Sequence, residues 1–408
     1  MLFVGDDWAE DHHDIEFQDE NGKVLRRARL PEGTEGIARL GEIAAGLLDE
    51  TGCPEQVLVC IEVDQGPWVY ALLAAGYRVY GVDPKQAQRH REILSSSGAK
   101  SDKADAHALA DMVRTRRRQL RQAGGDTPLA DAVKIVARAH QSMIWERGRH
   151  GSRLRAALRE YFPAMLAVCE AADLELVSPP ILALLAKAPT PAQAAKLAIR
   201  QILPLLKRRR RKDAKAAAIQ QILRGPQLGQ PEAVTAAYAA TVRASVAVLQ
   251  TVIAEIDELA EAVDTHFSQH PDHEIYLSQP GLGPALGPRM LAEFGDDPAR
   301  FSNSKARKNY AGTSPLTKQS GKNKIVSARH VYNKRLIDAA MGQAQAAILN
   351  DPSAYAYYRK QRQRKVEHNA ALRQLANRLI GILHGCLVHG TIYDPDEAWK
   401  DHTLTSAA

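Results

Sequence analysis

The sequence is poor in cysteine, and this limits both disulfide formation and thiolate metal sites. Its 408 residues include four cysteines, none of which has a neighbour at the spacing of a zinc motif or of a disulfide framework. We therefore expect reduced, mostly buried thiols. The chain also lacks an apolar run approaching the ~20 residues of a membrane span, and its N-terminus lacks the apolar stretch of a signal peptide. These absences predict a cytoplasmic protein without a membrane partner, in a bacterium-like cell.

Positive charge is present in excess and is concentrated late in the chain. The net charge is +7, with 25% charged and 45% hydrophobic residues, as in a soluble globular protein long enough for two or three domains. Residues 300–373 contain sixteen Lys and Arg but three acids. A basic surface of this kind predicts a polyanionic partner, although charge alone does not distinguish nucleic acid from a membrane surface.

The first 125 residues show the pattern of an α/β domain. Alternating or buried-type strands are expected at 2–4, 13–17, 24–28, 56–62 and 78–82, with helices at 35–48 and 67–75. Three strands, helix, strand, helix, strand is the order of the ribonuclease H (RNase H) arrangement, in which the first strand lies beside the fourth. We therefore predict an α/β fold of the RNase H/RuvC-like type for residues 1–125.

Four acids can meet in such a domain. Asp7 is expected just past the first strand and Glu62 at the end of the fourth, so both reach neighbouring strand ends. Asp102 and Asp105 fall on one side of the first turn of a helix for which Ser101 is a suitable cap. Four carboxylates can hold one or two Mg²⁺ ions that assist phosphodiester chemistry. The alternative for Asp102 and Asp105 is a favourable interaction with the helix dipole alone.

The same helix continues with an apolar stripe and a basic end. The stripe, which can hold the helix on a core, consists of Ala106, Leu109, Ala110 and Val113. Arg114 and Arg116 follow, in a position suited to a phosphate backbone near the metal. Other acids nearby are expected to be solvated or in turns; these are Asp6, Asp11, Asp14 and Asp64.

Residues 126–270 are expected to be helical. The segment 133–162 reads as a basic amphipathic helix, which either follows a nucleic acid backbone or is an ordinary solvated face. Residues 207–212 form a sharper basic run, and the prolines at 179–180 and 189–191 are expected in turns or a linker. Apolar residues at alternating steps of four and three in 232–267 predict a coiled coil or a long bundle helix. Its partner is either another helix of this chain or a second subunit.

A mainly α C-terminal domain is expected at 271–395, followed by a poorly ordered tail at 396–408. The turn with Gly281 and Gly283 presents backbone N–H groups suited to a phosphate, although such turns also occur for structural reasons. Residues 355–365 interleave tyrosines with basic side chains, which suits either stacking on a nucleic acid strand or a charged helix with buried tyrosines.

The most unusual segment of this domain is an expected loop at 310–324. It places Ser320 between Lys318 and Lys322, and Lys324, Arg329 and Arg335 add further positive charge. A serine becomes a nucleophile when a base or metal takes its proton, and the sequence shows no adjacent base. The loop alone therefore favours phosphate binding over a nucleophilic serine.

Taken together, these residues resemble the IS110 family of insertion-sequence transposases. The resemblance covers most of the chain and is weakest in its middle. It rests on VGDDWAEDHHD at the start, then the strand ending at Glu62 with GYRVYGVDPKQ and AKSDKADAHALA, and finally QPGLGPALGPRMLAEFGDDPARF with YAGTSPLTKQSGKNKIVSARHVYNKRL.

The resemblance implies a RuvC-like domain whose D-E-D-D tetrad corresponds to Asp7, Glu62, Asp102 and Asp105. It also implies a coiled-coil segment and a C-terminal transposase domain in which Ser320 becomes covalently joined to DNA, reversing the preference drawn from the loop alone. A structured guide RNA encoded by the element, called a bridge RNA, and a homo-oligomer, dimer or tetramer, are implied as partners beside donor and target DNA. Two departures from the family pattern lie next to the tetrad and leave it intact, but they put the number of metal ions and their affinity in question: Asp6 stands where an apolar residue is usual, and Val-Asp-Gln-Gly follows Glu62.

We therefore expect a DNA transposase or recombinase that acts through a phosphoserine intermediate with Mg²⁺ at the acidic site. Lys318, Lys322, Lys324 and Arg329 would neutralise phosphate charge. One alternative is a metal-dependent nuclease or junction resolvase in which water attacks and Ser320 binds phosphate. Another is a non-catalytic nucleic-acid-binding relative.

Overall fold

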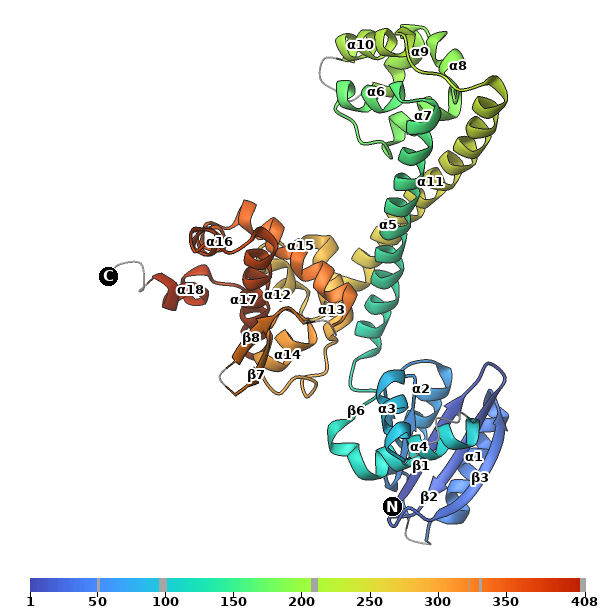
Figure 1. Ribbon diagram of the computed structural model, residues 1–408. Coiled ribbons are helices and arrows are strands. Elements are labelled where there is room, and N and C mark those ends of the chain that lie inside the picture. The colour runs from blue at the N-terminus through green and yellow to red at the C-terminus, as the bar shows by residue number, and fades with distance from the viewer. Residues whose placement is uncertain (50–51, 95–100, 207–211, 322, 330–331, 404–408) are drawn as a thin grey trace. The chain divides into compact units, whose positions relative to one another are not determined.

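The computed structural model describes residues 1–49, 52–94, 101–206, 212–321, 323–329 and 332–403 (Figure 1). The chain forms two compact units: Met1–Pro128 with Asp296–Ser302, and Leu129–Gly295 with Asn303–Ala408. The two segments of the first unit are joined through the side chain of Asp126, which is 6% exposed. Its carboxylate accepts hydrogen bonds from the backbone N–H groups of Asp296 and Asp297, both at 3.2 Å, and from Arg300 at 2.6 Å.

The first unit is built on a six-stranded mixed sheet in the order β3-β2-β1-β4-β5-β6. The strands are β1 (Leu2–Trp8), β2 (His12–Gln18), β3 (Val24–Pro31), β4 (Val57–Ile61), β5 (Arg78–Gly81) and β6 (Arg121–Gln122). β1 pairs antiparallel with β2 and parallel with β4, which confirms the predicted adjacency of the first and fourth strands. The two-residue β6, antiparallel to β5, is too short to show alternation and was not predicted.

Helices cover both faces of this sheet because the strands alternate apolar side chains between two cores. On one face, α1 (Thr34–Leu47) and α2 (Pro67–Ala74) pack on a cluster that includes Val4 and Phe17. On the other, α3 (Pro84–Leu94) and α4 (Asp102–Arg116) pack on Phe3, Leu58 and Cys60. The mixed α/β sheet is thus compatible with the predicted RuvC-like fold. α3 was not predicted.

Two long helices run through the second unit, α5 (Pro128–Tyr161) and α11 (Glu232–Phe267) (Figure 1). They contact each other near both ends. Tyr161 stacks on Tyr238 with ring centroids 5.3 Å apart, and Ala137 packs with Val263. The predicted helices over 133–162 and 232–267 are therefore confirmed, and part of the apolar seam of α11 is covered from within the chain. A coiled coil with a second subunit stays a prediction.

Short helices close a separate core between α5 and α11. They are α6 (Ala164–Ala172), α7 (Pro179–Lys187), α8 (Pro191–Ala195), α9 (Ile199–Ile202) and α10 (Lys212–Arg224). Of the prolines expected in turns or a linker, Pro189 lies in the connection between α7 and α8, as expected. Pro179, Pro180 and Pro191 instead lie in the first turns of these helices, where the absent proline N–H removes no helical hydrogen bond. Most of the basic run at 207–212 lies outside the described residues. Within the described chain, α11 is long and apolar enough to span a membrane, which is weak evidence because core helices meet the same criteria.

The C-terminal part is mainly helical, as expected. Its elements are α12 (His273–Ser278), α13 (Gly283–Phe294), α14 (Ser304–Tyr310), β7 (Leu316–Ser320), β8 (Asn323–Ser327), α15 (Lys334–Asn350), α16 (Pro352–Gln363), α17 (His368–His389) and α18 (Pro395–Thr403). The expected loop at 310–324 is instead largely a hairpin, β7–β8. The expected disorder of the tail does not hold for α18, because Trp399 is 3% exposed and donates a 2.8 Å hydrogen bond to Tyr393.

Candidate active site

The ends of β1 and β4 place Asp7 and Glu62 side by side in register. Asp7 lies within β1 rather than past it, and Glu62 follows the last residue of β4. Asp6 is the register partner of Ile61, so the next positions along these parallel strands are Asp7 and Glu62. Alternation directs Asp7 to the sheet face covered by α4, which is also the face of Phe3. Both acids are half-buried on that face.

Helix α4 begins as predicted and is held very close to β1. Ser101 is its N-cap and accepts a 3.3 Å hydrogen bond from the N–H of Ala104. The predicted apolar stripe is buried. A Cβ on Gly5 would lie 1.9 Å from the carbonyl oxygen of Ala106 and 2.5 Å from the nitrogen of Ala110. Only glycine at position 5 lets α4 approach this closely, so Gly5 helps to set the position of the helical acids.

The two acids of α4 have different partners. The exposed Asp102 accepts a 3.1 Å hydrogen bond from Arg29 of β3. Asp105, which is 7% exposed, forms an ion pair with Arg91 of α3. Each carboxylate therefore already has a counter-cation, and the burial of Asp105 is offset by its arginine. Although both acids lie in the first turn, they contact different parts of the first unit.

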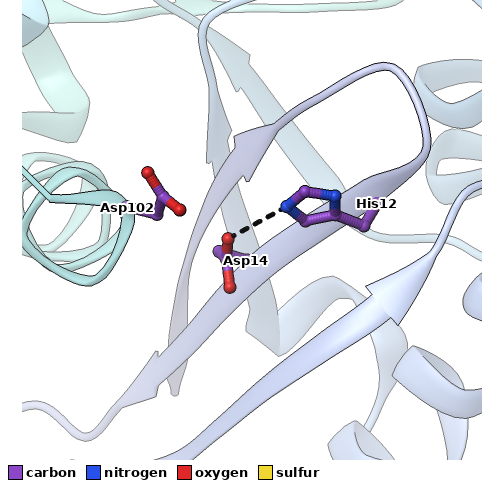
Figure 2. Close-up of side chains that lie close together, drawn as sticks. All are labelled: His12, Asp14 and Asp102. Carbon is purple, nitrogen blue, oxygen red and sulfur yellow. Dashed lines mark ion pairs between the residues drawn. The ribbon is translucent and has the colours of Figure 1, made fainter.

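A cluster that the sequence did not predict lies beside Asp102. Within the described residues, possible ligand atoms of His12, Asp14 and Asp102 all lie within 4.8 Å of one another (Figure 2). Asp14 was expected to be a solvated or turn acid, yet its side chain is 15% exposed and its residue pairs with Asp7 across β1 and β2. The cluster therefore joins one predicted metal ligand to two residues of β2. Alternation along β2 places His12 and Asp14 on one face, which was the available signal.

A pocket of about 590 Å³ opens next to this cluster. Its lining includes Asp14, Glu16, Arg27, Arg29 and Asp102. Glu16 is 1% exposed; it forms an ion pair with Arg27 at 2.7 Å, and Nδ1 of His107 lies 2.6 Å from its other carboxylate oxygen. The pocket thus presents both carboxylates and guanidinium groups, a combination that suits a cation and a phosphate together.

Asp6, the departure from the family pattern, lies on the opposite face of the sheet. It is fully buried and accepts hydrogen bonds from His13 and from the indole of Trp68, both at 2.7 Å. Nε2 of His13 lies 2.5 Å from Glu32. Burial alone would lower the pKa of His13, but its contacts with Asp6 and Glu32 outweigh burial and raise that pKa. Asp6 therefore has its own satisfied partners and does not share the face of Asp7.

Of the arginines predicted to contact nucleic acid at the end of α4, Arg114 is engaged within the protein. It forms an ion pair with Asp111, which His90 also contacts at 2.9 Å. Burial raises the pKa of Asp111, but the hydrogen bonds from Arg114 and His90 outweigh burial and lower it overall. Arg116 is half-buried at the last turn. These contacts anchor α4 to α3 behind the acids.

Ser320 lies in a very different environment from the acids. It is the last residue of β7, it is exposed, and it pairs with Asn323 across the hairpin. Lys318 and Lys324 on the two strands are also exposed, whereas Lys322 lies outside the described residues. Among the described residues, no side chain hydrogen-bonds to the hydroxyl of Ser320. The described residues therefore supply no base that is hydrogen-bonded to this hydroxyl.

Of the four remaining predicted contact residues, Gly281, Arg329 and Arg335 have structural partners. A Cβ on Gly281 would lie 2.4 Å from the carbonyl oxygen of Gln343 in α15, so this glycine allows the turn to pack on that helix. Gly283 begins α13 with open space around its Cβ position. Arg329 donates a 3.0 Å hydrogen bond to Asn309. Arg335 donates to Ser142 at 2.8 Å and lies over Trp145, so it connects α15 to α5.

Both the N-terminal and the C-terminal parts of the chain match family models of transposases. Residues 4–163, which contain the four acids, match a family model described as "Transposase" of the IS110 DEDD type. Residues 273–359, which contain Ser320, match "Transposase IS116/IS110/IS902 family". The mini-circle putative transposase for IS117 of Streptomyces coelicolor is 39% identical over 401 residues, covering 98% of this chain and 96% of the relative. The chain belongs to the IS110 family of transposases.

Other relatives agree with this assignment. The 42 kDa protein of insertion element IS900 from Mycobacterium paratuberculosis is 28% identical and covers 79% of this chain and 80% of the relative. The putative transposase y4uE of Sinorhizobium fredii is 34% identical over 210 residues, or 51% of this chain and 56% of the relative. The transposase is therefore an enzyme of an insertion element with DNA as its substrate, and its DEDD-type domain indicates a divalent-metal site.

Proposed function

We propose that this transposase cuts and rejoins DNA through a covalent phosphoserine intermediate formed by Ser320. The observation that carries the proposal is the exposed Ser320 at the end of β7, with Lys318 and Lys324 exposed on the same hairpin. A hydroxyl in this position can reach a phosphodiester without displacing any packed side chain. The lysines would neutralise the charge of the attacked phosphate.

The chemistry balances without an external energy source. The Oγ of Ser320 forms a bond to phosphorus and loses its proton, while the bond from phosphorus to the 3′ oxygen breaks and that oxygen takes up a proton. The product is a phosphoserine link and a free 3′-hydroxyl. Attack of a second strand's 3′-hydroxyl on this link reverses the step and frees Ser320. Each phosphoester bond is conserved, so strands can exchange without hydrolysis.

We propose Mg²⁺ as the metal at Asp7, Glu62, Asp102 and Asp105. The donor set fits, because carboxylate oxygens are the ligands that Mg²⁺ prefers, and two of these acids lie on the same sheet face at adjacent strand ends. When bound, the ion would supply charge stabilisation and a lower pKa for a coordinated hydroxyl. The protein's part is positional: β1 and β4 hold Asp7 and Glu62, and the close packing of α4 on Gly5 holds Asp102 and Asp105.

Donor and target DNA, a structured guide RNA encoded by the element, and a homo-oligomer, dimer or tetramer, are the partners we propose for a cytoplasmic enzyme. α16 offers suitable groups for a nucleic acid strand. Tyr355 is 46% exposed, and the guanidinium of Arg359 lies 5.8 Å from the centre of its ring. An exposed aromatic ring beside an arginine can stack on a base and contact its phosphate.

The test is to incubate the full-length protein, RNA from the flanks of the element and labelled junction DNA with Mg²⁺, and to resolve the products on a denaturing protein gel. We expect a labelled, protease-sensitive adduct that Ser320→Ala and Asp102→Ala both abolish. Ser327→Ala, at the end of the partner strand β8, is the matched control and should retain the adduct.

Two results would contradict the proposal in different ways. Cleavage without an adduct, unchanged in Ser320→Ala, would indicate a metal-dependent nuclease or resolvase in which water attacks. Binding of DNA and RNA without any turnover, unchanged in Asp102→Asn, would indicate a non-catalytic nucleic-acid-binding protein. Omission of the RNA from the same reaction tests the guide: an undiminished adduct on the junction DNA would exclude that partner from the cleavage step.

A further inference from the structure

The imidazole of His12 is oriented as a metal ligand usually is. Its Nδ1 lies 2.6 Å from a carboxylate oxygen of Asp11, and its Nε2 lies 3.4 Å from Oδ2 of Asp14. Histidine ligands commonly donate one ring N–H to a carboxylate outside the coordination sphere, which fixes the tautomer and directs the other nitrogen at the ion. With the proton on Nδ1, the lone pair of Nε2 faces the oxygen of Asp14. Two such acceptors favour a cation between them.

Asp102 supplies the third donor from a different element. Possible ligand atoms of His12, Asp14 and Asp102 lie within 4.8 Å of one another, and Figure 2 shows the three side chains converging from β2 and α4. Donors that are each about 2 Å from one ion lie at most about 4 Å apart, so the observed spacing is close to that of a coordinated set. The side chains of His12 and Asp14 are 25% and 15% exposed, which leaves an entry path for a hydrated ion.

The positive charge of Arg29 lies between Asp14 and Asp102, where a metal ion bound to both carboxylates would lie. Its Nη2 lies 2.6 Å from Asp14 and 3.1 Å from Asp102, so one guanidinium nitrogen bridges both carboxylates. The Nε of Arg29 also donates a 3.0 Å hydrogen bond to Asp14, but the side chain is 57% exposed and lines the adjacent pocket, so a guanidinium released from the carboxylates has solvent or a phosphate in that pocket open to it. A cation that binds these carboxylates would therefore displace Arg29 rather than displace a packed side chain.

We propose that His12, Asp14 and Asp102 form a second divalent-cation position beside the acidic tetrad, sharing Asp102 with it and competing with Arg29. This inference rests on the proposed function, because it takes the tetrad proposed there as the first metal position. The imidazole gives this position a nitrogen ligand, which suits transition-metal ions such as Zn²⁺ better than Mg²⁺, whereas the all-carboxylate tetrad suits Mg²⁺ and Mn²⁺. The released Arg29 then contacts a phosphate, which couples metal occupancy to nucleic acid binding.

The test is a titration of the full-length, nucleic-acid-free protein with Mn²⁺, followed by electron paramagnetic resonance of free and bound ion. We expect about two ions per chain, as in two-metal phosphoryl-transfer sites. Spin-echo modulation from a coordinated ¹⁴N should be present, and His12→Ala should remove both this modulation and one of the ions. His150→Ala, in α5, is the control for adventitious binding by imidazole and should change neither.

A second variant gives an effect of the opposite sign, which a misfolded protein would not produce. Arg29→Gln removes the competing cation, so Mn²⁺ should bind about three- to fivefold more tightly, the size of effect expected for an exposed ion pair. Arg26→Gln, on the same strand but the opposite sheet face, should leave the affinity unchanged.

The outcomes separate this inference from the tetrad. Glu62→Gln should remove the other ion and keep the ¹⁴N modulation. Loss of the ion in Glu62→Gln with no effect of His12→Ala and Arg29→Gln would overturn the second position and leave the tetrad standing. Loss of the nitrogen-coordinated ion in His12→Ala with no effect of Glu62→Gln and Asp7→Asn would overturn the tetrad as a metal site and support the position at His12.

Discussion

The acids of the first unit and the serine of the hairpin are held in contrasting ways. Asp105 is buried and paired with Arg91, and the helix that carries it is packed against Gly5. Ser320 is exposed on a two-stranded hairpin in which Ile325 is 64% exposed as well. The packing of the first unit positions the acids, whereas Ser320, as the nucleophile that we propose, would take its reactive surroundings from whatever binds over the hairpin. We therefore expect substitution of the serine to lower activity with little change in stability, and substitution in the packing around the acids to lower stability.

The largest effect that sharpens this contrast is expected at Ser320. Ser320→Ala should lower the rate of adduct formation by at least about a thousandfold, because no other group replaces the hydroxyl that we propose as the nucleophile. The same change should leave the free energy of unfolding within about 0.5 kcal/mol, because the side chain is exposed. Urea unfolding and the adduct assay on one preparation check both parts. A large loss of stability would show that the hairpin is a packed element and would break the comparison.

At Gly5 we expect a large loss of stability. Gly5→Ala places a methyl group within 1.9 Å of a backbone oxygen of α4, so the helix must move away from β1. We expect a loss of about 3 kcal/mol or more in unfolding free energy, together with weaker metal binding. Gly46→Ala is the control, since nothing lies within 4 Å of its added methyl group in α1. Equal stability of the two variants would mean that α4 is not fixed by its contact with β1.

A pH-dependent effect is expected at Asp111, which anchors α4 to α3. Its folded-state pKa is lowered, so its stabilising contribution is present above the unfolded value of 3.8 and is lost as the pH falls through the folded value. Asp111→Asn should therefore cost about 2 kcal/mol at pH 7, and the cost should shrink below pH 3.8. Urea titrations at several pH values, with the exposed Asp49→Asn as control, measure this. A cost that does not vary with pH would show that the charge of Asp111 is irrelevant.

The smallest effect is expected on the hairpin itself. Ile325→Thr should change the free energy of unfolding by less than about 0.5 kcal/mol, because most of the side chain is already in water. Leu109→Ala, in the buried stripe of α4, should cost about 2–5 kcal/mol. Chemical denaturation of both variants measures the difference. A cost above 1 kcal/mol for Ile325→Thr would place the hairpin within a packed core and contradict its description as an exposed element.

The sequence predicted the parts of the fold that depend on periodicity. Alternation and apolar runs indicated the sheet order, and Ser101 before Asp102 indicated where α4 begins. It did not predict the hairpin, because β7 and β8 are exposed almost throughout and so lack the alternation that a half-buried strand shows. The tail was misjudged because one buried residue, Trp399, holds α18 in place.

The candidate site was predicted in part for the same reason. The spacing of the acids and the resemblance led to Asp7, Glu62, Asp102 and Asp105, whose roles stay a prediction. His12 and Asp14 were missed because their significance depends on cross-strand neighbours. Alternation tells which face a residue occupies, but the approach of Asp14 to Asp102 also depends on the placement of α4 over β2.

The first unit is made of two segments that lie far apart in the sequence, and this limits how related genes can recombine. Asp126 contacts the backbone of Asp296 and the side chain of Arg300, residues encoded about 170 codons downstream. A crossover anywhere between these two coding regions would combine an Asp126 from one parent with a 296–302 segment from the other. We expect hybrids of related elements to succeed only where both parents supply a compatible pair, so the codons for Asp126 and for residues 296–302 should be inherited together.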